Sequence, residues 1–439
     1  MPGEVRGLEY LHSRYGVLPW AEVVKPAVKV ARNGFVVSHD LVRFMGFATQ
    51  DFDFLTKDRN WAIDFAPNGT RLGLGDTIHR KRYADTLERL ALEGAEAFYT
   101  GSMADATVEA VKASNGTMIA QDLRDYAIVP RPAIEIRYRG FNIYGCGAPA
   151  SGAVALNILK TLEGYEDFAE PEILNLSTHR LDEAIRFGYG KRTELGDPDF
   201  LDGIYEFEAD MIDVKSAAAI RAKISDHHTQ NVSAYDPNGF ESAETHGTSH
   251  IVTADSSGLA TSLTTTINLL FGSRVLVPET GIIMNNEMND FSIPHVRNAF
   301  GYVPTPANYI RPNKRSLSSI TPLIVEHLSN HSLFAVLGAA GGSRIITATI
   351  QNALDVIDRK LTAHEALARP RLHDQLIPNQ VAFEWDYDNR TVQYMKERGH
   401  NVTWVPPVYS SAQALKLSSN GSFEAAGEPR QKDSAGLTV

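Results

Sequence analysis

The sequence is 439 residues long and carries 42 lysines and arginines against 53 aspartates and glutamates, a formal net charge of −11. This acidic balance argues against nucleic acid as a partner, and the one cysteine, Cys146, excludes an internal disulfide and a cysteine-based metal site. The sequence contains neither a run of the roughly 18 apolar residues that a membrane span needs nor a basic, apolar leader at its start.

The first half of the chain is predicted to be mostly helical. Residues 20–33 have apolar side chains at helical spacing and are followed by Gly34, although we expect Pro26 to break this helix into two pieces. Residues 133–146 alternate apolar and polar side chains in two runs, which predicts a two-part strand. Further helices are predicted over residues 84–98, 103–113, 154–162 and 181–188.

The second half is predicted to be rich in strands, which begin after a polar segment. Residues 223–247 lack apolar periodicity and carry Asp, Asn, Ser, Gly and Pro, so we expect an exposed loop. Strands over residues 250–255 and 259–268 flank an Asp-Ser-Ser-Gly turn. Later strands are predicted at residues 320–326, 333–338, 380–385, 401–405, 413–418 and 422–426, with a helix over 345–360. This order indicates an α+β fold with antiparallel strands.

Thr248 is a hydroxyl residue at the junction between the polar segment and the first of these strands. Peptide cleavage before it, between Gly247 and Thr248, would create an α-amino group beside its own hydroxyl. The pKa of a free α-amino group is about 7.7–8.0, so this amine could act as the base for a hydroxyl nucleophile. The pattern is therefore typical of an N-terminal nucleophile hydrolase, although a Gly-Thr-Ser-His string is also an ordinary way for a strand to begin.

Several segments in both halves of the chain have distinctive amino-acid sequences. Residues 248–294 open with Thr-Ser-His-Ile-Val-Thr and include Asn-Asn-Glu-Met-Asn-Asp-Phe at 285–291. The others are residues 1–7, 26–34, 145–152, 195–200, 312–322, 338–345 and 368–373. Together these segments resemble the γ-glutamyltranspeptidases, which are also called glutathione hydrolases. Residues 285–291 resemble the eukaryotic members of the family more than the bacterial ones. The resemblance implies a four-layer αββα sandwich. It also implies one shared globular domain, made of a large-subunit portion (1–247) and a small-subunit portion (248–439).

The resemblance also implies the catalytic residues. Thr248 would be the nucleophile that forms a γ-glutamyl ester, and its own amine would accept the proton. Thr266 would lie on the neighbouring strand with its hydroxyl bonded to that of Thr248. Gly341 and Gly342 would supply backbone N–H groups to the oxyanion, because a glycine lets the chain approach the substrate without a Cβ in the way.

A second set of residues would bind the amino-acid head group of the donor. Asp290 would accept its α-ammonium group, with Asn268 and Glu287 completing that side, and Ser318 and Ser319 would donate to its α-carboxylate. The donors would be glutathione and other γ-glutamyl compounds, and the acceptors water, amino acids or dipeptides. The protein would work as a heterodimer of its own two cleavage products, without a cofactor or a metal ion.

Two other functions remain open at this stage. One is a related N-terminal nucleophile acylase for a different amide, against which the combination of Asp290, Ser318 and Ser319 argues. The other is a truncated, catalytically impaired relative. In the family, the counterpart of Met1 lies well inside the large subunit, after a segment that contains a carboxylate-binding arginine. We therefore expect that these 439 residues alone bind γ-glutamyl substrates weakly. Nearby histidines, His246 and His250, are interpreted as structural.

Eight Asn-X-Ser/Thr sequons occur in the chain. Such triplets are the acceptor sites of N-glycosylation, and family members usually lie in the secretory pathway. The sequence therefore favours a glycoprotein of the secretory pathway, in a vacuole lumen, at the cell surface or outside the cell. The eight asparagines are Asn68, Asn115, Asn175, Asn231, Asn330, Asn389, Asn401 and Asn420.

Overall fold

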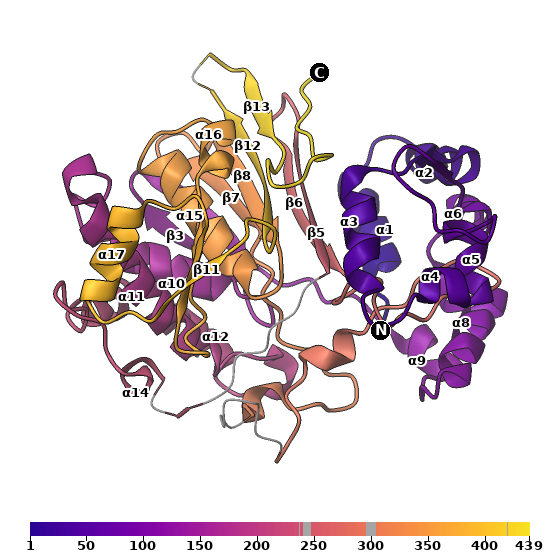
Figure 1. Ribbon diagram of the computed structural model, residues 1–439, viewed down its shortest axis with the longest axis horizontal. Coiled ribbons are helices and arrows are strands. Elements are labelled where there is room, and N and C mark those ends of the chain that lie inside the picture. Colours follow the sequence, from indigo (N-terminus) through magenta and orange to yellow (C-terminus); the bar gives the residue numbers. More distant parts are fainter. Residues whose placement is uncertain (237, 240–246, 296–303, 419) are drawn as a thin grey trace. The chain divides into compact units, whose positions relative to one another are not determined.

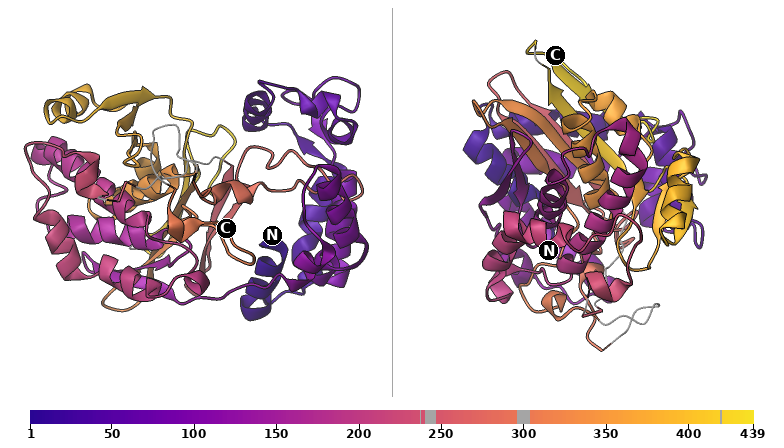
Figure 2. Two further views of the ribbon diagram at one scale, coloured as in Figure 1. Left: turned by 90° about the horizontal axis from the view of Figure 1, so that it is seen from below. Right: turned by 90° about the vertical axis from the view of Figure 1, so that its left-hand side faces the viewer.

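The computed structural model describes residues 1–236, 238–239, 247–295, 304–418 and 420–439. The chain forms two compact units. The smaller unit contains residues 1–130 and 269–286, and the larger unit contains residues 131–268 and 287–439. Both units are therefore built from segments on either side of Thr248. The N-terminal residues of the smaller unit are drawn in indigo and violet in Figures 1 and 2.

The smaller unit is mainly helical and has apolar clusters around Trp61 and around Phe98. The segment 269–286 is fastened to it by side-chain bonds: Trp61 donates to the carbonyl of Arg274 at 3.2 Å, and Thr86 donates to that of Thr280 at 2.9 Å. Its elements are α1 (Glu4–Tyr15), α2 (Trp20–Asn33), β1 (Phe35–Val36), α3 (His39–Ala48), α4 (Phe54–Lys57), α5 (Arg59–Phe65), β2 (Thr77–Ile78), α6 (Lys81–Glu93), α7 (Glu96–Tyr99), α8 (Gly101–Ala113) and α9 (Ala120–Asp125).

Two helix predictions in this unit need correction. Helix α2 continues through Pro26, where a break was expected. Pro26 is exposed, so water can hydrate the carbonyl of Glu22 that loses its usual N–H partner. The helix predicted over 84–98 is two helices, because Gly94 ends α6 with a φ of +80° that favours glycine.

The core of the larger unit is a six-stranded antiparallel sheet. Its order is β13 (Phe423–Ala426), β12 (Ser411–Leu417), β8 (Leu333–Ala340), β7 (Leu323–His327), β4 (Phe141–Cys146) and β3 (Ala133–Tyr138). The predicted two-part strand is the hairpin β3–β4, which turns at Arg139 and Gly140, both with positive φ. Because β4 pairs with β7, this sheet joins the sequence before Thr248 to the sequence after it.

Helices cover one face of this sheet, and a second β layer covers the other. Strand β8 shows the division: Leu337 and Ala339 pack in the cluster with the helices, whereas Val336 packs with Val252 of the hairpin β5–β6. Figure 1 shows the hairpin beside β7 and β8. The hairpin is β5 (Thr248–Ala254) and β6 (Ala260–Thr266). The helices on the other face are α10 (Gly152–Glu163) and α15 (Arg344–Ile357), and α11 (Leu174–Arg192) packs on α10.

The remaining elements lie around this core. They are α12 (Ile204–Met211), α13 (Val214–Arg221), α14 (Val232–Tyr235), α16 (Ala363–Ala368), α17 (Asn389–Glu397) and a three-stranded sheet of β11 (Val402–Val405), β10 (Val381–Glu384) and β9 (Leu372–His373). The described ranges also contain single-turn 3₁₀ helices at Pro171–Ile173, Pro198–Phe200, Glu287–Asp290 and Pro306–Asn308. The mixture of helices with antiparallel strands agrees with the predicted α+β class.

The segment predicted as an exposed loop, 223–247, contains a short helix that packs against the core. Its short helix α14 ends at Tyr235, which is 4% exposed and donates its hydroxyl to the carboxylate of Glu183 at 2.7 Å. One aromatic residue with a buried partner is enough to fix this part of a polar segment. Residues 240–246, which directly precede the expected cleavage site and include His246, lie outside the described residues.

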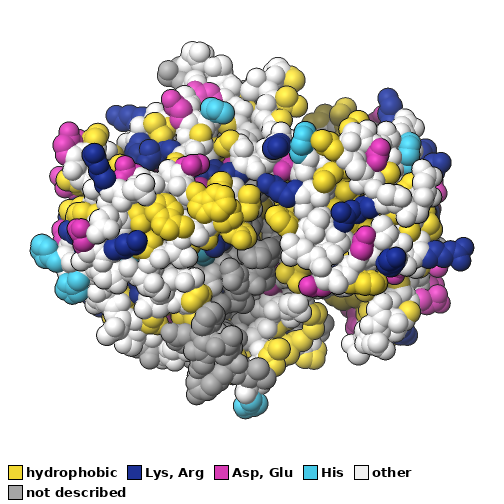
Figure 3. Space-filling model, viewed as in Figure 1, with side chains coloured by type: hydrophobic (Ala, Val, Ile, Leu, Met, Phe, Trp, Pro, Cys, Tyr) yellow, Lys and Arg dark blue, Asp and Glu magenta, His cyan; other side chains and the backbone are white. Residues whose placement is uncertain are grey.

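The described surface mixes charges of both signs. On the face shown in Figure 3, basic and acidic side chains are interspersed, and apolar side chains gather in several places between them. Large exposed apolar side chains include Trp385, at 62% exposure, and Trp404, at 36%, near the three-stranded sheet. Within the described ranges, no helix is long and apolar enough to cross a bilayer.

Candidate active site

Thr248 and Thr266 face each other at the open end of the hairpin β5–β6. They are directly opposite in the antiparallel register, so both side chains lie on the same face of the hairpin. The hydroxyl of Thr248 donates to Oγ1 of Thr266 at 3.1 Å, and both residues are half-buried. The hydroxyl contact that the sequence predicted between these two threonines is therefore present in the structure.

The carbonyl group of Gly247, the residue before Thr248, accepts two hydrogen bonds. One comes from the hydroxyl of Thr266, at 3.3 Å, and the other from the backbone N–H of Ile267, also at 3.3 Å. The N–H of Asn268 in turn donates to Oγ1 of Thr266 at 2.9 Å, which fixes the orientation of that hydroxyl. Two donors on one carbonyl oxygen stabilise the negative charge that develops there when the carbonyl carbon is attacked.

Three of the predicted head-group residues form one cluster next to this pair. Asn268, which follows β6, is 2% exposed and donates its amide to the carboxylate of Asp290. Glu287 and Asp290 are the two ends of one 3₁₀ turn and hydrogen bond through their side chains. The side-chain carbonyl oxygen of Asn268 is buried and accepts no hydrogen bond from a described residue. This cluster presents acceptors, as an ammonium group requires.

The two carboxyl groups of this cluster do not ionise independently. Burial, followed by the negative charge of Asp290, raises the pKa of Glu287 to about 8. Burial also raises the pKa of Asp290, while hydrogen bonds from Glu287 and Asn268 oppose that rise. At neutral pH the carboxyl group of Glu287 is therefore protonated and donates a hydrogen bond to Asp290, so at most one of the two carboxyl groups is negatively charged.

The raised pKa gives a pH prediction for Glu287. Its carboxyl group is neutral below about pH 8 and ionised above it, and the ionised form binds a cation better. The KM for a donor with an α-ammonium group should therefore fall between about pH 6.5 and about pH 8.5, while that group is still charged. Glu287→Gln keeps the neutral shape and should make KM independent of pH across this range. Steady-state kinetics of the native protein and the variant across this pH range test the prediction. An equal pH dependence of KM in the variant would show that Glu287 is not the titrating group.

The predicted serine pair is tied to the acidic cluster by a side chain that the sequence did not point to. Asn308 donates its amide to the backbone carbonyl of Asp290 at 2.6 Å and accepts from the N–H of Leu317 at 2.9 Å. The next residue, Ser318, donates its N–H to the carbonyl of Pro149 at 2.7 Å. The two expected halves of the head-group site are thus linked through Asn308, which no local sequence pattern marks.

Gly341 and Gly342 follow strand β8, with φ angles of +128° and +61°. A Cβ on Gly341 would lie 2.5 Å from the carbonyl oxygen of Tyr409, so a larger residue does not fit there. Within the described part of the chain, neither glycine N–H donates a hydrogen bond. His250 of the hairpin lies over Gly338 of β8. Thr248, two residues before His250, therefore lies toward the end of β8, where the glycine pair begins.

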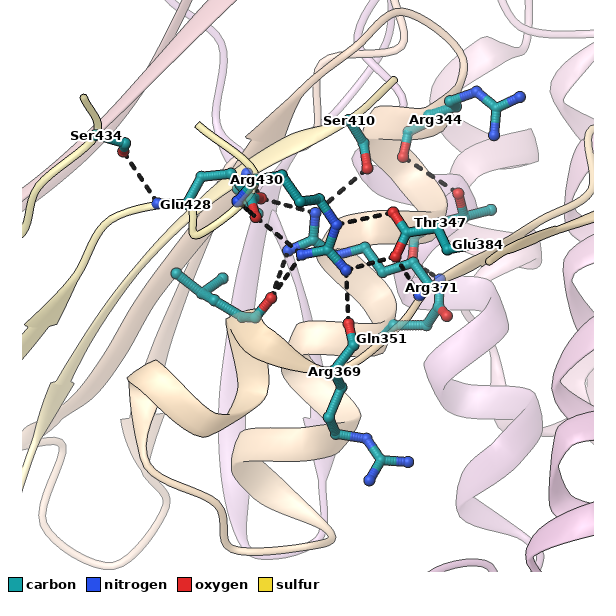
Figure 4. A network of polar contacts seen from close by, with 12 residues as sticks. Arg344, Thr347, Gln351, Arg369, Arg371, Glu384, Ser410, Glu428, Arg430 and Ser434 are labelled. Atoms are coloured by element: carbon teal, nitrogen blue, oxygen red, sulfur yellow. Dashed lines mark hydrogen bonds and ion pairs between the residues drawn. The ribbon is translucent and has the colours of Figure 1, made fainter. Parts of the chain in front are cut away.

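A buried ionic network supports the backbone against which Gly341 packs (Figure 4). Arg371 forms an ion pair with Glu428 at 2.8 Å and donates to the hydroxyl of Ser410 at 3.2 Å. Arg430 extends the network to Glu428, at 2.8 Å, and to Glu384. Because Ser410 touches the glycine turn, this network holds the turn in place from the C-terminal end of the chain.

Histidines in this unit form packing and hydrogen-bond contacts. His250 is 4% exposed, burial lowers its pKa to about 4, and its Nδ1 lies 2.8 Å from the hydroxyl of Thr264. A Cβ on Gly338 would come within 2.1 Å of its ring, so this glycine makes room for the histidine. Thus His250 is a neutral packing residue, as expected.

One group in the described ranges is close enough to share a metal ion: His179, Glu183 and His400. The rings of His179 and His400 already bond to each other at 2.8 Å, and Glu183 accepts the hydroxyl of Tyr235. Each of these three residues therefore already has a hydrogen-bond partner among the described residues.

The comparison with solved structures shows the fold. A cephalosporin acylase from Bacillus halodurans superposes with a TM-score of 0.81 over 98% of this chain and 77% of that chain, at 24% identity. This likeness shows that the two proteins share a fold. The fold class that the sequence predicted is confirmed.

The sequence comparisons define the family. Residues 1–438 match the Gamma-glutamyltranspeptidase family, and the chain belongs to it. It is 54% identical to the glutathione hydrolase proenzyme of Arthroderma benhamiae, and the match covers 100% of this chain and 75% of that protein. It is 48% identical to the glutathione hydrolase of Aspergillus flavus, and this match also covers 100% of this chain and 75% of that protein. The resemblance stated from the sequence motifs is thereby confirmed.

Proposed function

We propose that this chain is a self-processing glutathione hydrolase and γ-glutamyltransferase with Thr248 as its nucleophile. The observation that carries this proposal is the hydroxyl contact between Thr248 and Thr266 beside a doubly hydrogen-bonded Gly247 carbonyl. Family membership and the names of the similar fungal proteins support the choice of glutathione as the donor.

Self-processing uses the precursor's own groups. The hydroxyl oxygen of Thr248 attacks the carbonyl carbon of Gly247, and the Thr266 hydroxyl and the Ile267 N–H stabilise the resulting oxyanion. The C–N bond breaks, the nitrogen of Thr248 takes up the proton that the hydroxyl has released, and an ester joins Gly247 to the Thr248 oxygen. Water then hydrolyses this ester. The products are residues 1–247, ending in a carboxylate, and residues 248–439, beginning with a free amine.

Catalysis repeats this chemistry on the donor. The freed amine of Thr248 takes the proton from its own hydroxyl, whose oxygen attacks the γ-amide carbonyl of glutathione. The N–H groups of Gly341 and Gly342 receive the oxyanion. Cysteinylglycine leaves with the proton, and the γ-glutamyl ester on Thr248 passes to water or to the amine of an amino acid or dipeptide.

The head-group residues determine which acyl group is accepted. Asp290, Asn268 and Glu287 receive the α-ammonium group, and Ser318 and Ser319 donate to the α-carboxylate. An acylase for a different amide is the second candidate, because a cephalosporin acylase shares the fold. The buried acidic cluster favours a donor that carries an ammonium group, and so favours the first candidate.

The two cleavage products stay together without a disulfide. Strand β4 of the first product pairs with β7 of the second from Gly145 to Phe141, and α10 packs on α15. The active form is therefore a heterodimer of the products. The eight sequons support a glycoprotein of the secretory pathway.

The test of the proposal compares two anilides that differ in one group. γ-Glutamyl p-nitroanilide carries the α-amine, and glutaryl p-nitroanilide lacks it. The proposal predicts a kcat/KM at least about tenfold higher for the γ-glutamyl compound, since a charged hydrogen bond is worth about that much, and release of cysteinylglycine from glutathione. Faster cleavage of the glutaryl compound would establish the acylase instead.

A further inference from the structure

Arg192, the last residue of helix α11, is a buried cation with an unusual set of partners. It is 5% exposed, and none of the described acidic side chains forms an ion pair with it. Other buried arginines of this unit do have such partners: Arg186 binds Asp374 and Arg371 binds Glu428, each at 2.8 Å. A buried charge without a counterion is costly, so Arg192 needs a reason for its place in the fold.

The hydrogen bonds of Arg192 lead to the predicted serine pair. Its Nη2 donates to the hydroxyl of Ser319 at 3.0 Å, and its Nε donates to the hydroxyl of Ser151 at 3.1 Å. Ser151 then donates to the backbone carbonyl of Ser318 at 2.6 Å. One guanidinium group therefore positions both serines, one through its side chain and the other through its backbone.

The direction of these bonds determines what Ser319 can do. A guanidinium group only donates, so the oxygen of Ser319 acts as the acceptor and its hydrogen remains free for another partner. The neighbouring positive charge makes that hydroxyl a stronger donor, which suits an anion. Burial lowers the pKa of Arg192, and the neighbouring Tyr189 and Asp290 oppose this; arginine stays charged at any pH where the protein is folded.

We infer that Arg192 is a positioning residue for the donor's α-carboxylate, which it attracts to Ser319 and Ser318 through its positive charge. This inference rests on the proposed function. The head-group site then has a cation on one side and the Asp290 cluster on the other, joined through Asn308, and so matches the two charges of a zwitterionic amino acid. A ligand with only an ammonium group or only a carboxylate group would bind to only one of these two sides.

The experiment compares γ-glutamyl p-nitroanilide with 4-aminobutyryl p-nitroanilide, which keeps the amine and lacks the carboxylate. Arg192→Gln should lower kcat/KM for the γ-glutamyl compound by about 10- to 100-fold, mainly through KM, the range that charged hydrogen bonds are worth. The 4-aminobutyryl compound should be affected less than about threefold. Arg192→Lys keeps the positive charge but lacks the planar guanidinium group, which donates from two nitrogens. Its kcat/KM for the γ-glutamyl compound should therefore lie between the values for Arg192→Gln and the native protein.

Arg186→Gln is the matched control, because Arg186 is also a buried arginine of α11 but binds Asp374. It should lower the unfolding temperature without changing the ratio between the two substrates. Equal losses on both substrates in Arg192→Gln and Arg192→Lys would overturn the inference and leave Arg192 a structural residue. Failure of the native protein to prefer the γ-glutamyl compound over its glutaryl analogue would instead overturn the proposed function.

Discussion

Replacing Thr248 by alanine should leave the protein as a single uncleaved chain with no measurable γ-glutamyl hydrolysis. The variant lacks the oxygen that attacks the Gly247 carbonyl, so neither the ester intermediate nor the free amine of residue 248 can form. The expected loss in kcat is about 10³-fold or more, in the range seen when the nucleophile of a hydrolase is removed. A denaturing gel and an anilide assay on the same preparation measure both effects.

Thr248→Ser is the matched control for this experiment. It keeps the hydroxyl and removes one methyl group, so it should still give fragments 1–247 and 248–439, more slowly because serine is less constrained in rotamer than threonine. N-terminal sequencing of the smaller fragment should begin at residue 248. If Thr248→Ala were cleaved as fast as the native chain, a separate protease would be responsible and the proposed self-processing would be wrong.

Replacing Asp290 by alanine should have the second-largest effect, and it should act on donor binding. The change removes the carboxylate that faces the α-ammonium group and leaves the amide of Asn268 without its acceptor. Removing one partner of a buried charge pair costs about 2–5 kcal/mol, which corresponds to about 30-fold to several-thousand-fold in kcat/KM. Most of this loss should lie in KM for γ-glutamyl p-nitroanilide.

Two controls separate this effect from a loss of structure. Self-cleavage should persist in Asp290→Ala, because Thr248, Thr266 and the Gly247 carbonyl are unchanged and Asn308 bonds to the backbone of residue 290. The kcat/KM for glutaryl p-nitroanilide, which has no α-amine, should stay within about threefold of the native value. An unchanged preference between the two anilides would show that Asp290 does not recognise the amine.

Much of the fold could be predicted from local patterns. The alternation in residues 133–146 gave the hairpin β3–β4, and the Val-, Ile- and Thr-rich runs on either side of Asp255 gave β5 and β6. Local rules failed where surroundings decide the outcome. Pro26 lies inside an exposed helix that tolerates it, and Tyr235 orders a polar segment by reaching a buried carboxylate.

The sequence by itself determined the family, and it was the source of the proposed nucleophile and of the proposed head-group residues. These follow from short strings such as the one that begins at Thr248, because the chemistry needs particular side chains at particular places along the chain. Only the tertiary structure brought Arg192 to Ser319, 127 residues away, and raised the pKa of Glu287. Burial and hydrogen-bond partners depend on which distant segments pack together, and a linear pattern does not contain that information.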